Sequence, residues 1–215
     1  MAVQLSNVLK SRALWFLVLV FTLRSSLGDW YIVPSGSMQP SIEEGEYIFV
    51  NKLAYTLKFP FTSHALAQLG NPQRGDVVVF NSKVENERLV KRIIGLPGDV
   101  IAMSGDHLTI NGQPAKYLDL HQVGDAVQAR EQLGQMEHMM QVLPRVNPPQ
   151  QNMRAVTVPA DQYLVLGDNR DNSKDSRFIG FVPRSEMLGH AIRVLASFDP
   201  DHYFMPRFQR FGTAL

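Results

Sequence analysis

The most apolar stretch of the chain lies close to its start, where residues 13–23 read ALWFLVLVFTL, with a threonine as the only polar residue. Lys10 and Arg12 precede it. At about 1.5 Å per residue the run covers only about half of a ~30 Å hydrocarbon core, so a membrane span would also need residues 25–33, with Arg24 snorkelling or facing protein. The pattern therefore predicts a membrane-targeting segment.

We interpret residues 1–30 as a cytoplasmic stub followed by an uncleaved, single-pass anchor helix. The positive-inside rule keeps Lys10 and Arg12 in the cytoplasm and places the rest of the chain on the other side of the membrane. The alternative is a cleavable secretory signal, for which residues 26–28 (SLG) offer a small-x-small site before Asp29. Cleavage there would leave the polar segment that follows on a frayed terminus, a poor support for precise chemistry.

Beyond the anchor, hydrophobic residues come in short runs of strand length, separated by turn residues. These runs predict core strands at 47–50 (YIFV), 76–80 (DVVVF), 89–94 (LVKRII), 163–166 (YLVL) and 178–182 (FIGFV). A closing strand is predicted at 190–198 (HAIRVLASF).

Residues 53–73 mix aromatic residues with Pro60, a composition typical of a loop or of a partly inserted surface hairpin. Tyr55, Phe59 and Phe61 either rest on a membrane surface or form a hydrophobic cluster under the loop. The sequence leaves these two alternatives open.

The character of the chain changes in residues 105–154, where the turn Asn111-Gly112 predicts a hairpin that leads into a stretch rich in Gln, Met and Pro. We interpret this segment as an inserted subdomain that carries no chemistry. Met136, Met139 and Met140 indicate packing or a sticky helix face. The other predicted limits are those of a catalytic β domain, 31–104 and 155–198, and of a tail, 199–215.

Composition and charge narrow the function. Of 215 residues, 21 are Lys or Arg and 20 are Asp or Glu, so the chain lacks the basic field that binding to nucleic acid requires. Cysteine is absent, which excludes disulfides, thiolate metal sites and cysteine nucleophiles. The six histidines include no closely spaced pair, so we expect neither a metal nor another cofactor.

Two hydroxyls and a glycine lie between two prolines directly after the apolar segment, in residues 34–41 (PSGSMQPS). In an extended backbone Ser35 and Ser37 point to the same side, and Gly36 between them lets another chain approach closely. This arrangement suits an attacking hydroxyl, Ser37, with a second donor beside it. The alternative is a polar loop after an anchor, and a nucleophile also needs a base from elsewhere.

The run 89–94 carries two adjacent cations, Lys91 and Arg92, ahead of the turn 95–99 (GLPGD). In a strand they point to opposite faces, and we expect one of them to be buried. A lysine among apolar groups loses hydration of its charged form, so its pKa falls and it can serve as a neutral base, whereas arginine stays protonated. The alternative is a solvated pair that protects an edge strand from aggregation.

Residues 167–177 (GDNRDNSKDSR) form a dense polar stretch between the apolar runs at 163–166 and 178–182. With three acidic and three basic side chains, the stretch can satisfy itself by salt bridges and Asx turns. Its position beside core strands also suits a layer that locks catalytic side chains in place. The residues alone leave both interpretations open.

In their order along the chain, these segments resemble type I signal peptidases, the membrane-bound serine-lysine proteases that remove signal peptides from exported proteins. The resemblance rests on ordered motifs at 35–40 (SGSMQP), 45–52 (GEYIFVNK), 74–80 (RGDVVVF), 91–99 (KRIIGLPGD) and 167–177. Glu46 departs from the aspartate usual in the second motif, and Leu89 stands where some members carry tyrosine. Neither the insertion nor the tail is covered.

The resemblance implies that Ser37 is the nucleophile and Lys91 the general base, with the Ser35 hydroxyl and the Ser37 amide as the oxyanion hole. It also implies supporting residues, namely Ser173, which would hold the lysine, with Asp168, Asp175 and Arg177. The implied fold is mainly β: a two-sheet catalytic domain with a small β-rich insertion and an N-terminal membrane helix.

The implied substrates are preproteins that carry signal peptides and are cut after small residues in an Ala-x-Ala pattern. Shallow apolar pockets would accept the small residues one and three positions before the cut, and they would be lined by Tyr31, Val33, Ile42 and Val90. The implied location is the cytoplasmic (inner) membrane, with the lipid bilayer as a partner and the catalytic domain on the periplasmic side.

Two other classes of function stay in view. A self-cleaving repressor uses the same serine-lysine chemistry behind a DNA-binding helix-turn-helix, but the apolar run 13–23 stands in that place. A membrane-tethered binding module would be a catalytically dead scaffold, yet Ser37 and Lys91 are both present. A conventional triad of Ser37 with His190 and an aspartate is a further alternative mechanism.

Overall fold

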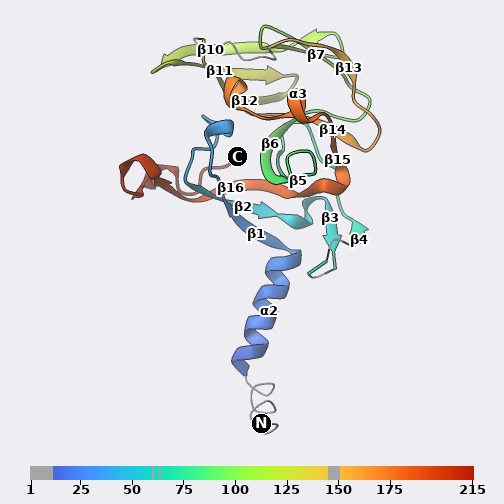
Figure 1. The fold of residues 1–215 in the computed structure, drawn as a ribbon, viewed down its shortest axis with the longest axis vertical. Coiled ribbons are helices and arrows are strands. Elements are labelled where there is room, and N and C mark those ends of the chain that lie inside the picture. The colour runs from blue at the N-terminus through green and yellow to red at the C-terminus, as the bar shows by residue number, and fades with distance from the viewer. Residues whose placement is uncertain (1–11, 60, 63, 145–150) are drawn as a thin grey trace.

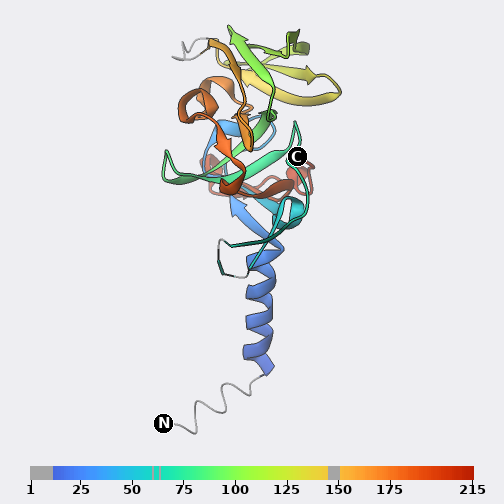
Figure 2. The same cartoon turned by 90° about the vertical axis from the view of Figure 1, so that its right-hand side faces the viewer.

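The computed structural model describes residues 12–59, 61–62, 64–144 and 151–215, and strands predominate in it, as the sequence predicts. The longest described helix, α2 (Arg12–Ser26), stands away from a β-rich body in two views at right angles (Figures 1 and 2). Its large apolar side chains are mostly exposed, Phe16 and Phe21 among them. Within the described residues, no helix has both the length and the apolar character needed to cross a membrane. Lys10, used to predict the orientation, lies outside those residues.

The expected continuation of the anchor through residues 25–33 is wrong. The helix ends at Ser26, and β1 (Gly28–Ile32) follows almost at once and pairs antiparallel with β2 (Glu46–Asn51). Aromatic and β-branched side chains in β1 favour a strand. These residues therefore belong to the sheet that carries the rest of the body.

Arg24 faces protein, which is one of its two predicted placements. Its Nε donates to Asp29 Oδ1 at 2.7 Å, and its guanidinium lies 3.9 Å from the centroid of the Trp30 ring. Lys52 Nζ donates to Asp29 Oδ2 at 3.0 Å and to the carbonyls of Arg24 and Ser25. The last carbonyls of a helix have no partner within it, so these contacts both cap α2 and tie it to the sheet.

The main sheet has eight strands in the order β1-β2-β16-β5-β6-β14-β15, with β17 paired to β16. Its further strands are β5 (Val77–Ser82), β6 (Glu87–Gly95), β14 (Gln162–Leu166), β15 (Val182–Pro183), β16 (Met187–Asp199) and β17 (Met205–Pro206). Strands predicted at 47–50, 76–80, 89–94, 163–166 and 190–198 are therefore confirmed. The last of them is a central strand, because β16 lies between β2 and β5.

The central strands bury side chains on both faces, as a strand covered on two sides must. Val78 and Phe80 pack into one apolar cluster, and Val77 and Val79 into another. Lys91 lies opposite Val78 in the antiparallel register of β5 with β6. The sheet thus carries Lys91 into the body of the molecule rather than to its surface.

Residues 53–73 contain a hairpin, one of the two predicted alternatives. It consists of β3 (Thr56–Lys58) and β4 (Ala65–Gln68), after the short 3-10 helix η2 (Lys52–Ala54). Tyr55 is buried in the core, as the cluster alternative predicts, whereas Phe59 is 55% and Phe61 69% exposed. The backbone N–H of Phe61 donates to Ser25 Oγ at 2.8 Å, so the hairpin tip lies beside the last turn of α2 (Figures 1 and 2).

Two smaller sheets lie at the far end of the body from α2 (Figure 1). One contains β13 (Met153–Thr157), β7 (Val100–Ser104), β8 (His107–Ile110) and β9 (Gln113–Pro114); the other contains β10 (Lys116–Val123), β11 (Ala126–Leu133) and β12 (Met136–Val142). The hairpin predicted at Asn111-Gly112 is confirmed, with positive φ at both residues. The methionine-rich stretch is a strand and not a helix, because β12 pairs with β11 along its length.

The strand predicted at 178–182 is wrong for every residue but the last, Val182. Asp175 caps the short helix α3 (Ser176–Ile179) by accepting from the N–H of Arg177, and only Val182 and Pro183 are in a strand. Residues 199–215, predicted as a tail, dock on the main sheet through β17 and ion pairs with Glu43 and Glu46. The remaining 3-10 turns are η3 (Arg170–Asn172), η4 (Arg184–Glu186), η5 (Pro200–His202) and η6 (Phe208–Arg210).

Candidate active site

Ser37 and Lys91, 54 residues apart in the sequence, meet in the structure. Lys91 Nζ donates to Ser37 Oγ at 2.7 Å and to the carbonyl oxygen of Val90 at 2.8 Å. Ser37 lies in the short 3-10 turn η1 (Gly36–Met38), and Lys91 lies within β6. A hydroxyl in hydrogen-bond contact with an amine is the geometry that activates a serine nucleophile.

Burial changes the chemistry of Lys91. The residue is 2% exposed, and loss of hydration lowers the pKa of its amine to about 8, although Asp175, Asp168 and Glu87 act in the opposite direction. About a tenth of the amine is therefore neutral at pH 7. Arg92 on the opposite face of the strand is buried as well, so both cations are buried where we expected one.

The backbone around Ser37 differs from the extended conformation that we expected for residues 34–41. Ser35 is extended, with φ −144° and ψ 154°, but Gly36 to Met38 turn as a 3-10 helix. The three atoms nearest to a Cβ on Gly36 would all belong to the side chain of Gln39, the first at 2.8 Å. The close approach of another chain segment occurs at Gly167 instead, where an added Cβ would lie 2.5 Å from the carbonyl oxygen of Ser37.

A cleft of about 700 Å³ opens over the Ser37–Lys91 pair. Both serines, Ser35 and Ser37, line it, although they do not share a strand face. Of the four predicted pocket residues, Tyr31, Val33 and Val90 line the cleft. Ile42 does not; it is fully buried and packs in the same apolar cluster as the other three.

Ser173 lines the cleft, but its predicted hydrogen bond to the lysine is absent. Its Oγ is buried and has no hydrogen-bond partner among the described residues. An added Cβ on Gly167 would lie 2.3 Å from that Oγ, so the hydroxyl rests against the Gly167 backbone. The carbonyl of Val90 makes the contact to Lys91 that we expected from Ser173.

The predicted supporting residues hold the loop 167–177 rather than touch the reacting pair. Asp175 accepts from the Gly167 N–H at 3.0 Å and from Arg177 Nε at 2.8 Å. Asp168 pairs with Arg92 through two hydrogen bonds, of 2.9 and 2.7 Å. The charged groups of the loop thus find only some of their partners within it, because Asp168 pairs with Arg92 of β6.

Sequence reasoning missed three buried residues near the site, Asn169, Glu131 and His138. Asn169 belongs to a recognised motif but had no role, and the other two lie in the insertion, to which we assigned no chemistry. On β11 the residues Ala129, Glu131 and Leu133 all point inward. A carboxylate in such an inward-facing series is the signal that was available, since a buried charge needs a partner.

The histidine alternative is not supported by the contacts. His190 stacks on Tyr55, and its Nε2 lies 3.8 Å from Asp76 Oδ1. No described histidine makes a hydrogen bond to Ser37, and none lines the cleft over it. Of these side chains, only the Lys91 amine contacts the Ser37 hydroxyl.

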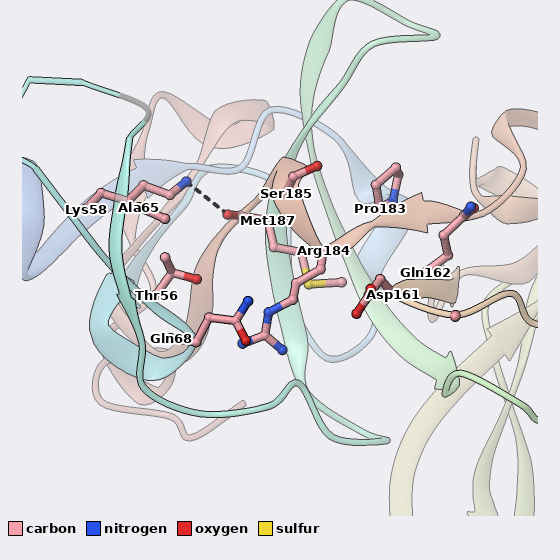
Figure 3. Close-up of a pocket in the computed structure, with 11 residues that line it drawn as sticks. Thr56, Lys58, Ala65, Gln68, Asp161, Gln162, Pro183, Arg184, Ser185 and Met187 are labelled. Atoms are coloured by element: carbon pink, nitrogen blue, oxygen red, sulfur yellow. Dashed lines mark hydrogen bonds between the residues drawn. The ribbon is translucent and has the colours of Figure 1, made fainter.

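A second cavity, of about 430 Å³, lies between the β3–β4 hairpin and β15 (Figure 3). It also contains a lysine and a serine, Lys58 and Ser185, but Lys58 Nζ donates to the carbonyl oxygen of Met187 at 3.3 Å. The guanidinium of Arg184 is engaged by the carbonyls of Tyr55 and Gly70. This cavity therefore holds no activated hydroxyl.

Comparison with known proteins places the chain among peptidases. The family model described as "Signal peptidase, peptidase S26" matches residues 6–196. "Signal peptidase I" of Pseudomonas aeruginosa is 38% identical over 217 residues, covering 92% of this chain and 75% of that protein. The protein of the same name from Pseudomonas fluorescens is 36% identical over 218 residues, covering 91% and 75%. A crystal structure of a signal peptidase I from Enterococcus faecalis V583 aligns with a TM-score of 0.36 at 31% identity, covering 56% of this chain and 96% of that one.

Proposed function

Because the chain belongs to the signal peptidase family S26, and is thus a serine endopeptidase that removes signal peptides, we propose that it works through a dyad of Ser37 and Lys91 at the surface of a membrane. The observation that carries the proposal is the 2.7 Å contact between Lys91 Nζ and Ser37 Oγ in a buried setting. No other pair of nucleophile and base in the described chain has this geometry.

The neutral amine of Lys91 takes the proton of Ser37 as Oγ attacks the scissile carbonyl. Negative charge then develops on the carbonyl oxygen, and the Ser37 N–H and the Ser35 hydroxyl donate to it as the oxyanion hole. The protonated Lys91 returns its proton to the leaving amine, which frees the carboxyl-side product. A water molecule activated by the same amine hydrolyses the acyl-enzyme and restores both residues.

The substrate binds extended along the cleft, with its backbone pairing to strand edges and alternate side chains entering pockets. Tyr31, Val33 and Val90 form an apolar wall there, and buried Ile42 supports it from below. The pockets accept Ala or similarly small residues one and three positions before the cut. Asp168, Asp175 and Arg177 keep the loop beside the dyad in place, and Ser173 packs against Gly167 within that loop.

The segment that ends with α2 at Ser26 attaches the enzyme to the cytoplasmic membrane, with the catalytic body on the periplasmic side. The exposed apolar side chains of α2 and the exposed Phe59 and Phe61 at the neighbouring hairpin tip support this placement. The 15 residues of α2 supply about 22 Å of helix for this attachment. The Ser37–Lys91 pair then faces preproteins as they leave the membrane.

Incubation of the detergent-solubilised full chain with one ordinary preprotein tests the function. We expect product of mature size from the wild type and none from Ser37→Ala. A reagent that acylates activated serines should label Ser37 and no other residue. Binding of the preprotein without cleavage, and without labelling, would support the binding-module alternative instead.

A further inference from the structure

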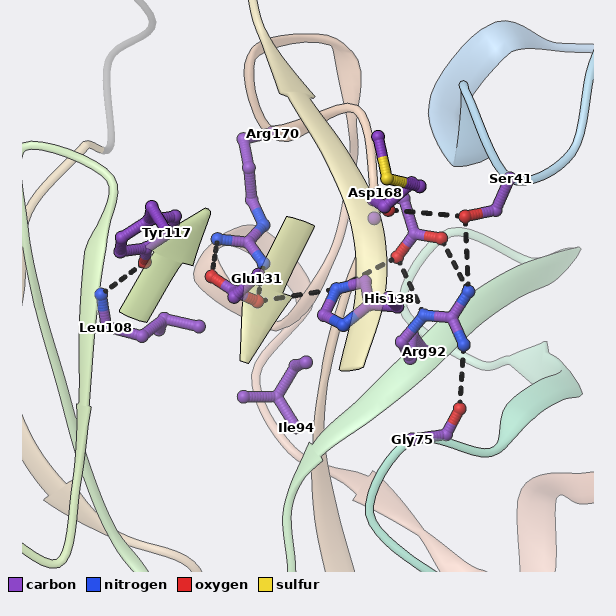
Figure 4. Close-up of polar contacts among 12 residues, drawn as sticks. Ser41, Gly75, Arg92, Ile94, Leu108, Tyr117, Glu131, His138, Asp168 and Arg170 are labelled. Carbon is purple, nitrogen blue, oxygen red and sulfur yellow. Dashed lines mark hydrogen bonds and ion pairs between the residues drawn. The ribbon is translucent and has the colours of Figure 1, made fainter. Parts of the chain in front are cut away.

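The insertion contributes a buried charge to the body that carries the dyad (Figure 4). Glu131 on β11 accepts two hydrogen bonds from the guanidinium of Arg170, one of them 2.9 Å long, and neither side chain is exposed. Moving two charges out of water costs about as much as their attraction returns, so such a pair is a weak source of stability. The two parallel hydrogen bonds do fix the orientation of the guanidinium relative to the carboxylate, and they therefore set the position of Arg170.

The surrounding groups make this cluster neutral as a whole. His138 lies between two carboxylates, with Nε2 3.3 Å from Glu131 and 3.5 Å from Asp168, and Asp168 pairs with Arg92. Burial lowers the pKa of His138 to about 4, so the ring is uncharged near neutral pH. Two guanidinium groups balance two carboxylates, and the cluster joins the insertion to β6.

The main chain of residues 168–170 is held from the same side. The N–H of Gln141 on β12 donates to the carbonyl of Asp168 at 2.8 Å, and Gln141 pairs with Asn169 in a short parallel bridge. Arg177 also donates to the carbonyl of Arg170. The insertion therefore holds residues 168–170 in place through β11 and β12.

Asn169, in the middle of that segment, clamps the turn that carries the nucleophile. Its backbone N–H donates to the carbonyl of Ser37 at 3.1 Å, and its Nδ2 donates to the carbonyl of Gly36 at 3.0 Å. The Gly36 carbonyl and the Ser37 N–H belong to one planar peptide unit and point in opposite directions. A hydrogen bond that holds this carbonyl consequently determines where the Ser37 N–H points.

We propose that Glu131 is a positioning residue for catalysis. Glu131 holds Arg170, the neighbouring Asn169 holds the Gly36–Ser37 peptide unit, and the Ser37 N–H of that unit donates to the oxyanion. This rests on the proposed function, in which that N–H stabilises the transition state. Misplacing such a group by about 1 Å costs on the order of 100-fold in rate, so we expect kcat to fall roughly tenfold to 100-fold when Glu131 loses its charge.

The test compares Glu131→Gln, Asn169→Ala and their combination in the full-length enzyme. We expect each single variant to lower kcat with KM within about twofold of the wild type, because the substrate pockets are untouched. The acid limb of the pH profile should stay in place, since the contacts of Lys91 are intact. The double variant should lose no more than Asn169→Ala alone, because the two residues act on the same peptide unit. Glu137→Gln, an exposed carboxylate on the adjacent β12, is the matched control and should leave kcat unchanged.

Three results would overturn the proposal: wild-type kcat in folded Glu131→Gln, wild-type kcat in Asn169→Ala, or losses that multiply in the double variant. Where Glu131→Gln does not fold, Glu131→Leu combined with Arg170→Met removes both charges and leaves neither unpaired. We expect that double variant to melt near the wild-type temperature with the same loss of kcat, and normal kcat would again refute the role. Turnover in Ser37→Ala would instead refute the proposed function, so the two failures are distinguishable.

Discussion

In the proposed mechanism, the pH dependence of turnover follows from the burial of Lys91. Only the neutral amine can take the Ser37 proton, and protonation of a buried lysine with a pKa of about 8 removes the base as the pH falls. The neutral fraction is about one hundredth at pH 6, one tenth at pH 7 and one half at pH 8. We therefore expect kcat/KM to rise about tenfold from pH 6 to 7, about fivefold from pH 7 to 8, and to level off above pH 9.

The assay measures kcat/KM on a peptide that has no group titrating in this range, with tryptophan fluorescence confirming the fold in each buffer. Lys91→Arg keeps the charge but stays protonated at every pH, so its rate should be flat and about 10²–10⁴-fold lower. Lys83→Arg, an exposed lysine in the turn after β5, is the matched control and should reproduce the wild-type curve.

A rate that stays level from pH 6 to 8 in folded enzyme would refute the assignment of Lys91 as the base. Near-normal turnover in Lys91→Arg would show that the amine acts merely as a cation. A histidine-based mechanism would then have to be reopened, and His190→Ala would be the first variant to measure, because Asp76 lies beside that ring.

Three further predictions concern the substrate, the anchor and the fold. Preproteins with Leu or Phe immediately before the cut should be processed at least about 100-fold more slowly than those with Ala, and equal rates would contradict the pocket assignment. Amino-terminal sequencing of membrane-fractionated protein should find the chain's own first residues, whereas a mature chain starting at Asp29 would favour a cleaved signal. Arg92→Met leaves the carboxylate of Asp168 buried and unpaired, so chemical denaturation should show a loss of about 3–5 kcal/mol, against less than about 1 kcal/mol for the exposed Arg88→Met.

The sequence predicted the parts of the site that depend on local pattern. Strand periodicity placed Lys91 and Arg92 on opposite faces, and the apolar runs marked the strands that position them. The meeting of Ser37 with Lys91 did not follow from that periodicity; the family resemblance implied it. Local hydrophobic pattern can predict the environment of each residue, since alternation along β6 decides which side chains enter the core.

Interactions between distant segments account for the errors. Residues 28–32 continue an apolar stretch, yet pairing with β2 makes them a strand. Phe178 and Ile179 follow a capping aspartate, which favours a helical turn over the strand that their hydrophobicity indicated. Glu131 has no local feature that reveals Arg170 as its partner, because the pair forms only when the insertion packs against the loop.

Arg92 and Arg177 offset the effect of two carboxylates of the 167–177 loop on the pKa of Lys91. Asp168 and Asp175 lie near Lys91, and each acts to raise its pKa and so to keep the base protonated. Both carboxylates are bonded to buried guanidinium groups, of Arg92 and Arg177. The field of such a pair falls off faster with distance than that of a single charge, so desolvation remains the larger influence on the amine. Replacing either arginine by a neutral residue would expose Lys91 to an uncompensated carboxylate and raise the pKa of its amine. The acid limb of the pH profile would then shift to higher pH, and turnover near neutral pH would fall.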